Sequence, residues 1–410
     1  MSHEKIDIAI IGGGAAGFFA AINAKLHHSD KNVVIFEKSK KVLSKVKISG
    51  GGRCNVTNAT FGIADLCKKY PRGHKELKKI FNQFKVKDTI DWFESRGVKL
   101  VTQSDNCIFP ESQSSQTIID CFFSECNKLG VKIRTESSVI KLTKPVDDFI
   151  LELKDSKICA EKVILTIGGQ PKLSGFNLLD GLGHSIVNPV PSLFTFNMPS
   201  EAIKTLMGVV VNPVNTRIQS TKLSENGPLL VTHWGMSGPA VLKLSAWGAR
   251  ILNEKEYNCK LQVNWINNLN YNHVTDSLRM EIEKHKHKKV INQKITNIPT
   301  RLWHYLLNKI ELNTEKKWSE LSKKEFNKLV EVLVNDIYEV KGKTTFKEEF
   351  VTAGGIALSE VDFNTMQSKI HKGLFFAGEA LNIDGITGGF NFQAAWSSAF
   401  VASKLNFVGS

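Results

Sequence analysis

Glycines and one carboxylate near the start of the chain have the types and spacing of a phosphate- and ribose-binding site. The segment from Gly12 to Gly17 reads GGGAAG and matches the pattern G-x-G-x-x-G. Gly12 permits a tight turn, Gly14 lets the backbone approach a pyrophosphate, and Gly17 lets a helix pack closely on a strand. Glu37 follows the last glycine by 20 residues (37 − 17 = 20), the spacing at which an acid reaches a ribose hydroxyl. The pattern predicts dinucleotide binding.

Two apolar strands and a helix must position these residues. Residues 6–11 have the length and β-branched content of a buried parallel strand, and residues 18–26 continue as a helix. Residues 33–36 form a second apolar strand that ends at the carboxylate. The helix N-terminus supplies free N–H groups and a positive dipole end for phosphates. A signal peptide or membrane span is the alternative, but Asp7 and the glycine cluster argue against it.

Composition predicts a cytoplasmic globular protein with no membrane partner. The chain has 410 residues, enough for two or three domains, with 42% hydrophobic and 23% charged residues. Its seven cysteines are an odd number without C-x-x-C spacing, which favours a reducing compartment and neither a disulfide framework nor a metal site. No targeting segment stands out.

The formal charge of +14 allows nucleic acid, an anionic surface or an acidic substrate as a partner. The excess is dispersed, and its densest run, Lys284 to Lys289 (KHKHKK), is expected on an exposed helix. We therefore expect a solvated lysine-rich surface, with a nucleic-acid footprint as the less favoured alternative. The sequence does not predict the oligomeric state.

Three further glycine-rich stretches have the character of ligand-facing loops. Lys47 to Asn58 carries three consecutive glycines followed by Arg53, which offers charge-assisted donors. A buried strand at 161–167 ends in Gly168-Gly169, and another at 374–377 delivers Gly378-Glu379. The last stretch, GITGGFNFQAAWSSAF at 385–400, opens a helix with a glycine pair.

The order of these segments predicts an α/β domain built from both ends of the chain. We expect residues 1–192 as its first segment and 346–410 as its second. Between them, 193–345 is an inserted domain, with a β subdomain over about 193–268 and a helical part over about 269–345. In the first segment, apolar spacing predicts one helix over 74–96 that ends at Gly97.

The motifs KISGGGRCNVTN, THWGMSGP, VTAGGI, TMQSK and FFAGEALNIDGITGGFNFQAAW follow the opening unit in one order. Together they resemble the bacterial NAD(P)/FAD-dependent oxidoreductases of the BaiN/RdsA type, a group that includes aminoacetone-oxidase-like flavoproteins. The resemblance spans nearly the whole chain. It implies a two-segment, glutathione-reductase-like FAD-binding Rossmann-type domain with an inserted β-plus-helical domain. It also implies FAD as the cofactor and allows NAD(P)H as the electron donor.

The resemblance also implies a set of FAD-binding residues, whereas no catalytic residue is identified. A helix N-terminus against the flavin ring would stabilise the negative charge of the reduced flavin. By the resemblance, the pyrophosphate would be held by Gly12, Gly14, Ala15, Ala16 and Gly17, the adenosine ribose by Glu37 and Lys38, and the adenine by Val139. The flavin would be lined by Gly51, Gly52, Arg53, Cys54 and Asn55, and Thr166 and Gly168 would pass beneath the cofactor. The ribityl chain would lie near Gly378 and Glu379, and the flavin ring near Gly388, Gly389, Phe390 and Asn391.

Departures from related flavoproteins leave the substrate open. Cys54 has no second cysteine close by, which disfavours a dithiol relay, and no second complete G-x-G-x-x-G unit predicts a nicotinamide domain. The segment after Gly169 differs from the usual pattern of the family. We expect an FAD-dependent oxidoreductase that acts on a small organic substrate between the flavin and the insert. The alternatives are a flavoprotein that acts on RNA, as in tRNA modification, and a non-catalytic FAD-binding redox partner.

Overall fold

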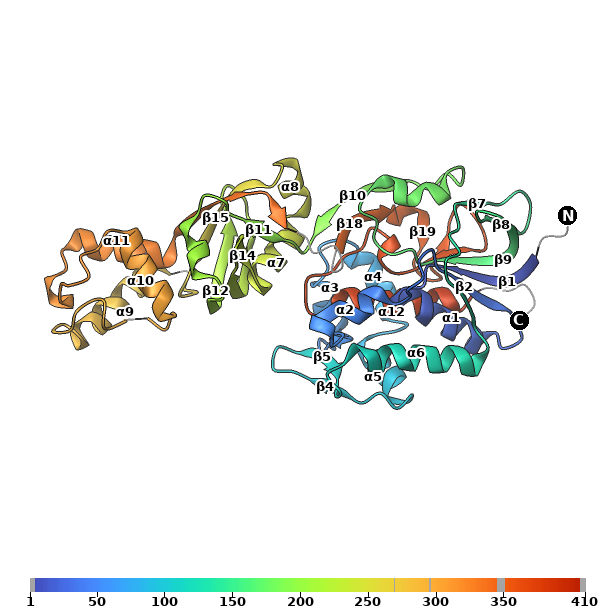
Figure 1. Cartoon of the computed structure of the whole chain (residues 1–410), viewed down its shortest axis with the longest axis horizontal. Coiled ribbons are helices and arrows are strands. Elements are labelled where there is room, and N and C mark those ends of the chain that lie inside the picture. Colours follow the sequence, from blue (N-terminus) through green and yellow to red (C-terminus); the bar gives the residue numbers. More distant parts are fainter. Residues whose placement is uncertain (1–3, 269, 295, 345–350, 406–410) are drawn as a thin grey trace. The chain divides into compact units, whose positions relative to one another are not determined.

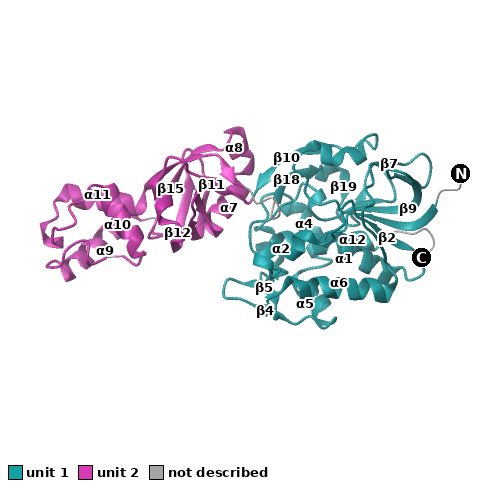
Figure 2. Cartoon of the chain, viewed as in Figure 1, with its two compact units in different colours: residues 1–192, 346–410 teal, residues 193–345 magenta. Residues whose placement is uncertain are grey.

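The computed structural model describes residues 4–268, 270–294, 296–344 and 351–405 (Figure 1). The chain divides into unit 1, residues 1–192 and 346–410, and unit 2, residues 193–345 (Figure 2). Unit 1 therefore contains both ends of the chain, and the glycine-rich motifs at the two ends belong to one compact body.

The main sheet of unit 1 has the strand order β19-β20-β21-β9-β1-β2-β6. From β21 to β6 all neighbours are parallel, so the carboxyl ends of these strands share one edge. The β1 side chains Ile8, Ile10 and Ile11 are buried, as expected for a strand covered on both faces. The strands are β1 (Glu4–Ile11), β2 (Val33–Phe36), β6 (Lys132–Arg134), β9 (Lys157–Leu165), β19 (Val361–Asp362), β20 (Gln367–Ser368) and β21 (Leu374–Phe376).

Three helices form the core layer against this sheet. Helix α1 (Ala15–His27) packs against both α12 (Phe390–Ser403) and α6 (Ser115–Leu129). Its residues 16–24 are all buried, which fits a helix enclosed on every side. The Phe19 ring lies 4.6 Å from that of Trp92 and 5.3 Å from that of Trp396, so aromatic packing joins the first and last helices.

The single helix predicted over 74–96 is wrong, because two helices occupy this range. Helix α4 (His74–Phe81) and helix α5 (Val86–Glu94) are separated by a short break. Phe84 in the break is buried, and Asp88 accepts a hydrogen bond from the Lys85 backbone N–H to cap α5. The remaining unit 1 elements are α2 (Ser44–Gly52), β3 (Thr57–Asn58), α3 (Ile63–Cys67), β4 (Leu100–Thr102), β5 (Cys107–Pro110), β7 (Lys141–Thr143), β8 (Phe149–Glu152), η1 (Leu173–Leu179), β10 (Ile186–Ser192), β18 (Val351–Ile356), η4 (Leu358–Glu360) and η5 (Gly378–Ala380).

Unit 2 contains an antiparallel sheet of order β16-β15-β12-β13-β14-β11-β17 with its own core, which includes Trp265, Trp303 and Trp318. Within the described part of the chain, no helix is long and apolar enough to cross a membrane. The elements of unit 2 are β11 (Thr195–Asn197), η2 (Ala202–Leu206), β12 (Val210–Ile218), β13 (Ser224–Val231), β14 (Gly235–Ser237), α7 (Pro239–Trp247), α8 (Ala249–Glu254), β15 (Asn258–Asn264), α9 (Tyr271–Lys284), α10 (Thr300–Lys309), η3 (Trp318–Glu320), α11 (Lys323–Val334), β16 (Asp336–Lys341) and β17 (Lys343–Thr344).

Two expectations for the insert need correction. The part predicted as helical to residue 345 is helical only to Val334, because β16 and β17 return to the sheet beside β15 and β11. Side chains along β16 alternate between buried and exposed, as in a strand with one buried face. The sequence did not indicate this strand because it directly follows the apolar period of a helix. The basic run from Lys284 to Lys289 is on a helix only at its first residue, since α9 ends at Lys284 and turns follow.

Candidate functional site

The loop between β1 and α1 has the close packing that its glycines predict. Gly12 has φ +114°, and a Cβ there would lie 2.4 Å from the carbonyl oxygen of Thr166. A Cβ on Gly17 would lie 1.9 Å from the carbonyl oxygen of Gly12, so neither position accepts a side chain. A Cβ on Gly14, by contrast, would meet no atom within 4 Å. The backbone at Gly14 therefore has an open face next to the N-terminus of α1, which Ala15 and Ala16 begin.

Glu37 lies at the end of β2 and faces this loop. Its Oε2 accepts a hydrogen bond from Gly13 N at 2.8 Å, and its Oε1 accepts one from Ser39 N at 2.8 Å. Lys38 is exposed beside it. Ser137 N donates to the Glu37 carbonyl at 2.8 Å. Val139 is two residues further along the chain from this contact at the end of β2. Ser39 Oγ also donates to Glu37 Oε1 at 2.7 Å, so it is Oε2 that can accept a second hydrogen bond, from a ribose hydroxyl.

The glycine-rich stretch at the end of α2 departs from helical geometry and forms a left-handed turn. Gly51 and Gly52 have φ of +70° and +82°, and a Cβ on either would meet no atom within 4 Å. The Arg53 guanidinium lies 4.2 Å from the Phe109 ring centroid, and its Nε donates to the Gly50 carbonyl at 3.1 Å. Cys54 is fully buried, and burial raises the pKa of its thiol to about 12, so the thiol stays protonated near neutral pH. Only the Cys54 backbone is therefore suited to contact a ligand.

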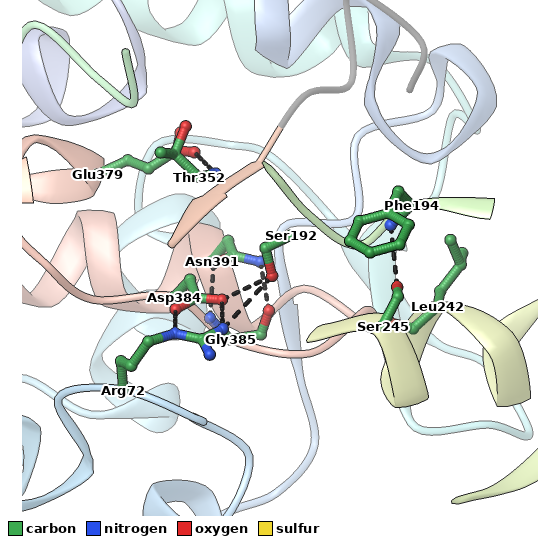
Figure 3. Close-up of polar contacts among 10 residues, drawn as sticks. All are labelled: Arg72, Ser192, Phe194, Leu242, Ser245, Thr352, Glu379, Asp384, Gly385 and Asn391. Atoms are coloured by element: carbon green, nitrogen blue, oxygen red, sulfur yellow. Dashed lines mark hydrogen bonds and ion pairs between the residues drawn. The ribbon is translucent and has the colours of Figure 1, made fainter. Parts of the chain in front are cut away.

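The second chain segment meets the first at Gly378. A Cβ on Gly378 would lie 2.8 Å from the Ala16 Cβ, so the end of β21 lies against the start of α1. Glu379 follows, and its Oε1 accepts from Thr352 N at 2.9 Å (Figure 3). Its Oε2 accepts from Lys45 Nζ at 2.8 Å. Glu379 thereby joins the beginning and the end of unit 1.

A buried ion pair holds the loop that leads to α12. Asp384 is fully buried, and the Arg72 guanidinium donates to both of its carboxylate oxygens (Figure 3). Ser192 Oγ donates to Asp384 Oδ2 at 2.7 Å. Asn391 closes the loop, because its amide donates to the Gly385 carbonyl at 2.9 Å and accepts from Gly385 N at 2.8 Å. The loop is thus fixed from both of its ends.

The N-terminus of α12 packs closely on the first segment. Gly389 has φ +90°, and a Cβ there would lie 2.6 Å from the Thr57 carbonyl oxygen. The Asn55 amide, in the orientation that satisfies both of its polar atoms, accepts from Gly389 N at 3.1 Å. Gly388 has φ +122°, and the Phe390 side chain is buried. The predicted residues here are therefore together in space, but Asn55, Phe390 and Asn391 direct their side chains to protein contacts.

The residues present fit an FAD molecule. The loops that carry Gly14, Gly168 and Gly378 follow β1, β9 and β21, whose carboxyl ends lie at one edge of the sheet, where nucleotides bind in such folds. Gly168 has φ +71° with no atom within 4 Å of a Cβ, which leaves another open face. A helix N-terminus for the pyrophosphate and carboxylates for sugar hydroxyls match the chemistry of the cofactor. The individual contacts to FAD stay predictions.

Sequence reasoning missed four side chains that the structure brings to this site: Arg72, Ser192, Thr352 and Asp384. Thr352 lies in the motif VTAGGI and Asp384 in NIDGITGG. The position of Asp384 next to a glycine-rich loop is the one local signal in the sequence that could have indicated a role at the site. Two polar residues of the motifs KISGGGRCNVTN and THWGMSGP, Lys47 and His233, have other surroundings. Lys47 Nζ donates to Gln116 at 2.7 Å, and His233 lies exposed in unit 2 with its ring centroid 4.2 Å from that of Trp234.

Known proteins with similar sequences span the whole chain. The family model described as HI0933-like protein Rossmann domain matches residues 6–405. A ribosomal RNA dihydrouridine synthase of Escherichia coli is 29% identical over 98% of both chains. A 3-dehydro-bile acid delta(4,6)-reductase of Clostridium scindens is 26% identical over 97% of this chain and 98% of its own. A ribosomal RNA dihydrouridine synthase of Haemophilus influenzae is 28% identical over 96% of both.

These matches confirm the expected resemblance to BaiN/RdsA-type enzymes and the expected Rossmann-type FAD fold. They also confirm the expected class of enzyme, since the relatives include a reductase that is similar over nearly its full length. The chain belongs to the HI0933-like Rossmann family, a family of flavoprotein oxidoreductases.

Proposed function

We propose that this protein is an FAD-dependent reductase that adds hydrogen to a carbon–carbon double bond conjugated to a carbonyl group. The observation that carries the proposal is the set of glycine-lined open faces at one sheet edge, completed by Gly378 and Glu379 from the far end of the chain. The names of the relatives support the reaction class. A delta(4,6)-reductase and a dihydrouridine synthase both yield products in which such a double bond has been saturated.

The chain's own residues would bind and orient the cofactor, which supplies a hydride once it is reduced. The N-terminus of α1 and the open face at Gly14 would hold the pyrophosphate, and Glu37 a ribose hydroxyl. The N-terminus of α12 would stabilise negative charge on the reduced ring, because its dipole is positive there. The ion pair of Arg72 and Asp384 would keep that helix start in place.

A small organic enone is the first substrate class that we propose, with NAD(P)H as the electron donor. An RNA uracil base is the second, and two observations favour it. Two of the relatives act on ribosomal RNA according to their names, and residues 193–345 contain 22 Lys and Arg against 14 Asp and Glu, a net charge of +8. Against it, a groove in unit 2 has mixed charge, since Lys324 and Lys328 share it with Glu311 and Glu331.

Anaerobic spectroscopy of the purified protein tests the reaction class. We expect a yellow protein whose flavin absorbance bleaches with NADH or NADPH and returns on addition of a substrate with a conjugated double bond. Saturated ketones of the same size serve as the control and should leave the flavin reduced. A protein that cannot be loaded with FAD would contradict the proposal, as would a reduced flavin that no enone or uracil-containing RNA reoxidises.

A separate binding measurement distinguishes the two substrate classes. For an RNA substrate, the logarithm of the association constant should fall linearly with the logarithm of salt concentration. Mass spectrometry of the RNA should then show two added hydrogens at a uracil. If ribosomal RNA fragments neither bind at low salt nor reoxidise the flavin, the small enone stays as the substrate class.

A further inference from the structure

Arg53 carries a positive charge that the fold holds in place but does not neutralise. Unit 1 contains four arginines, at positions 53, 72, 96 and 134. Three of them form ion pairs with carboxylates: Arg72 with Asp384, Arg96 with Glu125, and Arg134 with Glu4. Arg53 forms no ion pair with any residue that the structure describes. Its charge is therefore available to a ligand.

Three contacts fix the Arg53 guanidinium in one position. It lies 4.2 Å from the ring centroid of Phe109, which is buried in β5. Its Nε donates to the Gly50 carbonyl at 3.1 Å, and its Nη1 donates to Gln113 Oε1 at 3.3 Å. Gln113 is itself held, since its amide donates to the Pro110 carbonyl at 3.2 Å. A guanidinium has five N–H donors, so the fold orients this group while three of its donors stay free for a ligand.

A ligand can reach this charge. Arg53 is half-buried at the end of α2. The two preceding glycines leave room beside it, because a Cβ on Gly51 or Gly52 would meet no atom within 4 Å. A fully buried charge must be paired within the protein, whereas a half-buried one stays hydrated until an anionic group replaces the water. The site around Arg53 thus suits a group that is anionic or becomes anionic during a reaction.

The proposed reaction creates such a group on the substrate. A hydride, which takes two electrons from the reduced cofactor, forms a bond to the β carbon of the enone and breaks the carbon–carbon π bond. The electron pair moves toward the carbonyl, whose oxygen becomes an enolate oxygen, and a proton from water then binds the α carbon. The N-terminus of α12 is assigned to the negative charge of the cofactor ring. Arg53 is left for the charge on the substrate oxygen, which donors fixed in advance stabilise most effectively.

We propose that Arg53 is a catalytic residue whose guanidinium binds the carbonyl oxygen of the conjugated substrate and stabilises the enolate. The proposal rests on the proposed function, because that oxygen belongs to the substrate class proposed there. The family resemblance implies a place for Arg53 along the flavin, and the proposal gives its charge a role toward the substrate. The same role applies to a uracil base, whose carbon–carbon double bond is also conjugated to a carbonyl.

The test measures the two half-reactions of the natural holoprotein, Arg53→Gln and Arg53→Lys under anaerobic conditions. Flavin reduction by NADH or NADPH is followed first, and then reoxidation by conjugated carbonyl compounds, with cyclohex-2-enone as the first probe. Loss of one fixed oxyanion donor typically slows a reaction by about 100- to 1000-fold, so reoxidation of Arg53→Gln should slow by about that factor. Arg53→Lys should lie between, because lysine keeps the charge but not the planar fork. FAD affinity and the rate of flavin reduction should stay within about 3-fold.

Arg134→Gln is the matched control, because it removes an arginine of unit 1 that is paired with Glu4. It should leave both half-reactions unchanged. Reoxidation of Arg53→Gln at the natural rate would overturn the proposal. Equal slowing of reduction and reoxidation would overturn it as well, since the guanidinium would then act on the cofactor. A natural protein that no conjugated carbonyl compound reoxidises would instead overturn the proposed function.

Chemical modification gives a readout that does not depend on turnover. Phenylglyoxal modifies free guanidinium groups, and peptide mass spectrometry locates the modified residues. In the natural protein Arg53 should react faster than the paired Arg72 and Arg96, both with and without FAD. The enone should slow this reaction in the oxidised holoprotein, because it covers the guanidinium. Protection of Arg53 by FAD alone would overturn the proposal, and this measurement stays decisive if the Arg53 variants do not fold.

Discussion

At the scale of single residues, the glycines of the β1–α1 loop are required for two different physical reasons. Gly17 is required by packing, because a Cβ would overlap the Gly12 carbonyl oxygen at 1.9 Å. Gly14 is not required by packing, because a Cβ would meet nothing within 4 Å and its φ of −91° suits any residue. Its role must therefore lie with the ligand.

Substitution by alanine should separate these two roles. We expect Gly17→Ala to lower the free energy of unfolding by about 1–3 kcal/mol or more and to lose FAD. Gly14→Ala should change the stability of the FAD-free protein by less than about 0.5 kcal/mol but weaken FAD binding. Thermal unfolding and fluorescence titration with FAD measure the two effects. Unchanged FAD affinity in Gly14→Ala would place the pyrophosphate elsewhere.

The ion pair of Arg72 and Asp384 is the most buried pair of charges at the site. Burial raises the pKa of Asp384, while hydrogen bonds from Arg72 and Ser192 oppose that rise. Asp384→Asn removes the carboxylate charge that pairs with Arg72, and breaking a buried ion pair typically costs about 3–5 kcal/mol. We expect this loss in chemical unfolding, together with faster FAD release because the loop before α12 loses its anchor.

Glu125→Gln is the control for that prediction. It breaks the Arg96–Glu125 pair in the same unit, whose side chains are 17% and 12% exposed. This variant should lose stability without faster FAD release. If the two variants release FAD equally at matched stability, the Arg72–Asp384 pair has no special relation to the cofactor.

At the scale of elements, His184, two residues before β10, is linked to Ser368 of β20 by one hydrogen bond. Ser368 Oγ accepts from Ile370 N at 3.0 Å and His371 N at 2.9 Å, so its own hydrogen points to His184 Nε2 at 2.8 Å. His184 must then be neutral, with its proton on Nδ1. Burial lowers the pKa of His184 from 6.5, and His371 lowers it further while Glu360 opposes this.

This arrangement predicts a stability that falls in acid. The folded-state pKa lies below 6.5, so below that pH the unfolded chain binds a proton that the folded chain excludes. The contribution is complete above pH 6.5 and declines as the pH falls through 6.5. His184→Gln keeps an acceptor for Ser368 and should melt with a weaker pH dependence between about pH 7 and 5. Parallel melting curves for the two proteins would contradict the assignment.

Elements with local signals could be predicted from the sequence, whereas long-range pairings could not. The β1–α1–β2 unit is specified within residues 4–37, and the structure contains it. The break between α4 and α5 could not be predicted from the spacing of apolar residues, because that spacing continues through the buried Phe84 in the break. The Arg72–Asp384 pair joins residues 312 positions apart. Such features follow from tertiary packing.

At the scale of the whole molecule, the chain leaves and re-enters unit 1 at adjacent points. Strands β10 and β18 are antiparallel, and Ser192 pairs with Val351 in their register. Paired residues in such a ladder are about 5 Å apart, a span that a two- to five-residue hairpin turn closes. Unit 2 has its own buried core. The insert thus takes the place that a short hairpin turn between β10 and β18 could have.

A chain in which a short Asn-Gly turn joins Ser192 to Val351 should therefore fold without the insert. We expect it to bind FAD within about 10-fold of the full chain, because the assigned cofactor residues all lie in unit 1. The flavin spectrum and FAD titration measure this, and residues 193–345 alone should give the circular dichroism of a folded protein. A folded unit 1 that cannot bind FAD would mean that residues of the insert complete the cofactor site, and the assignment of that site to unit 1 would be wrong.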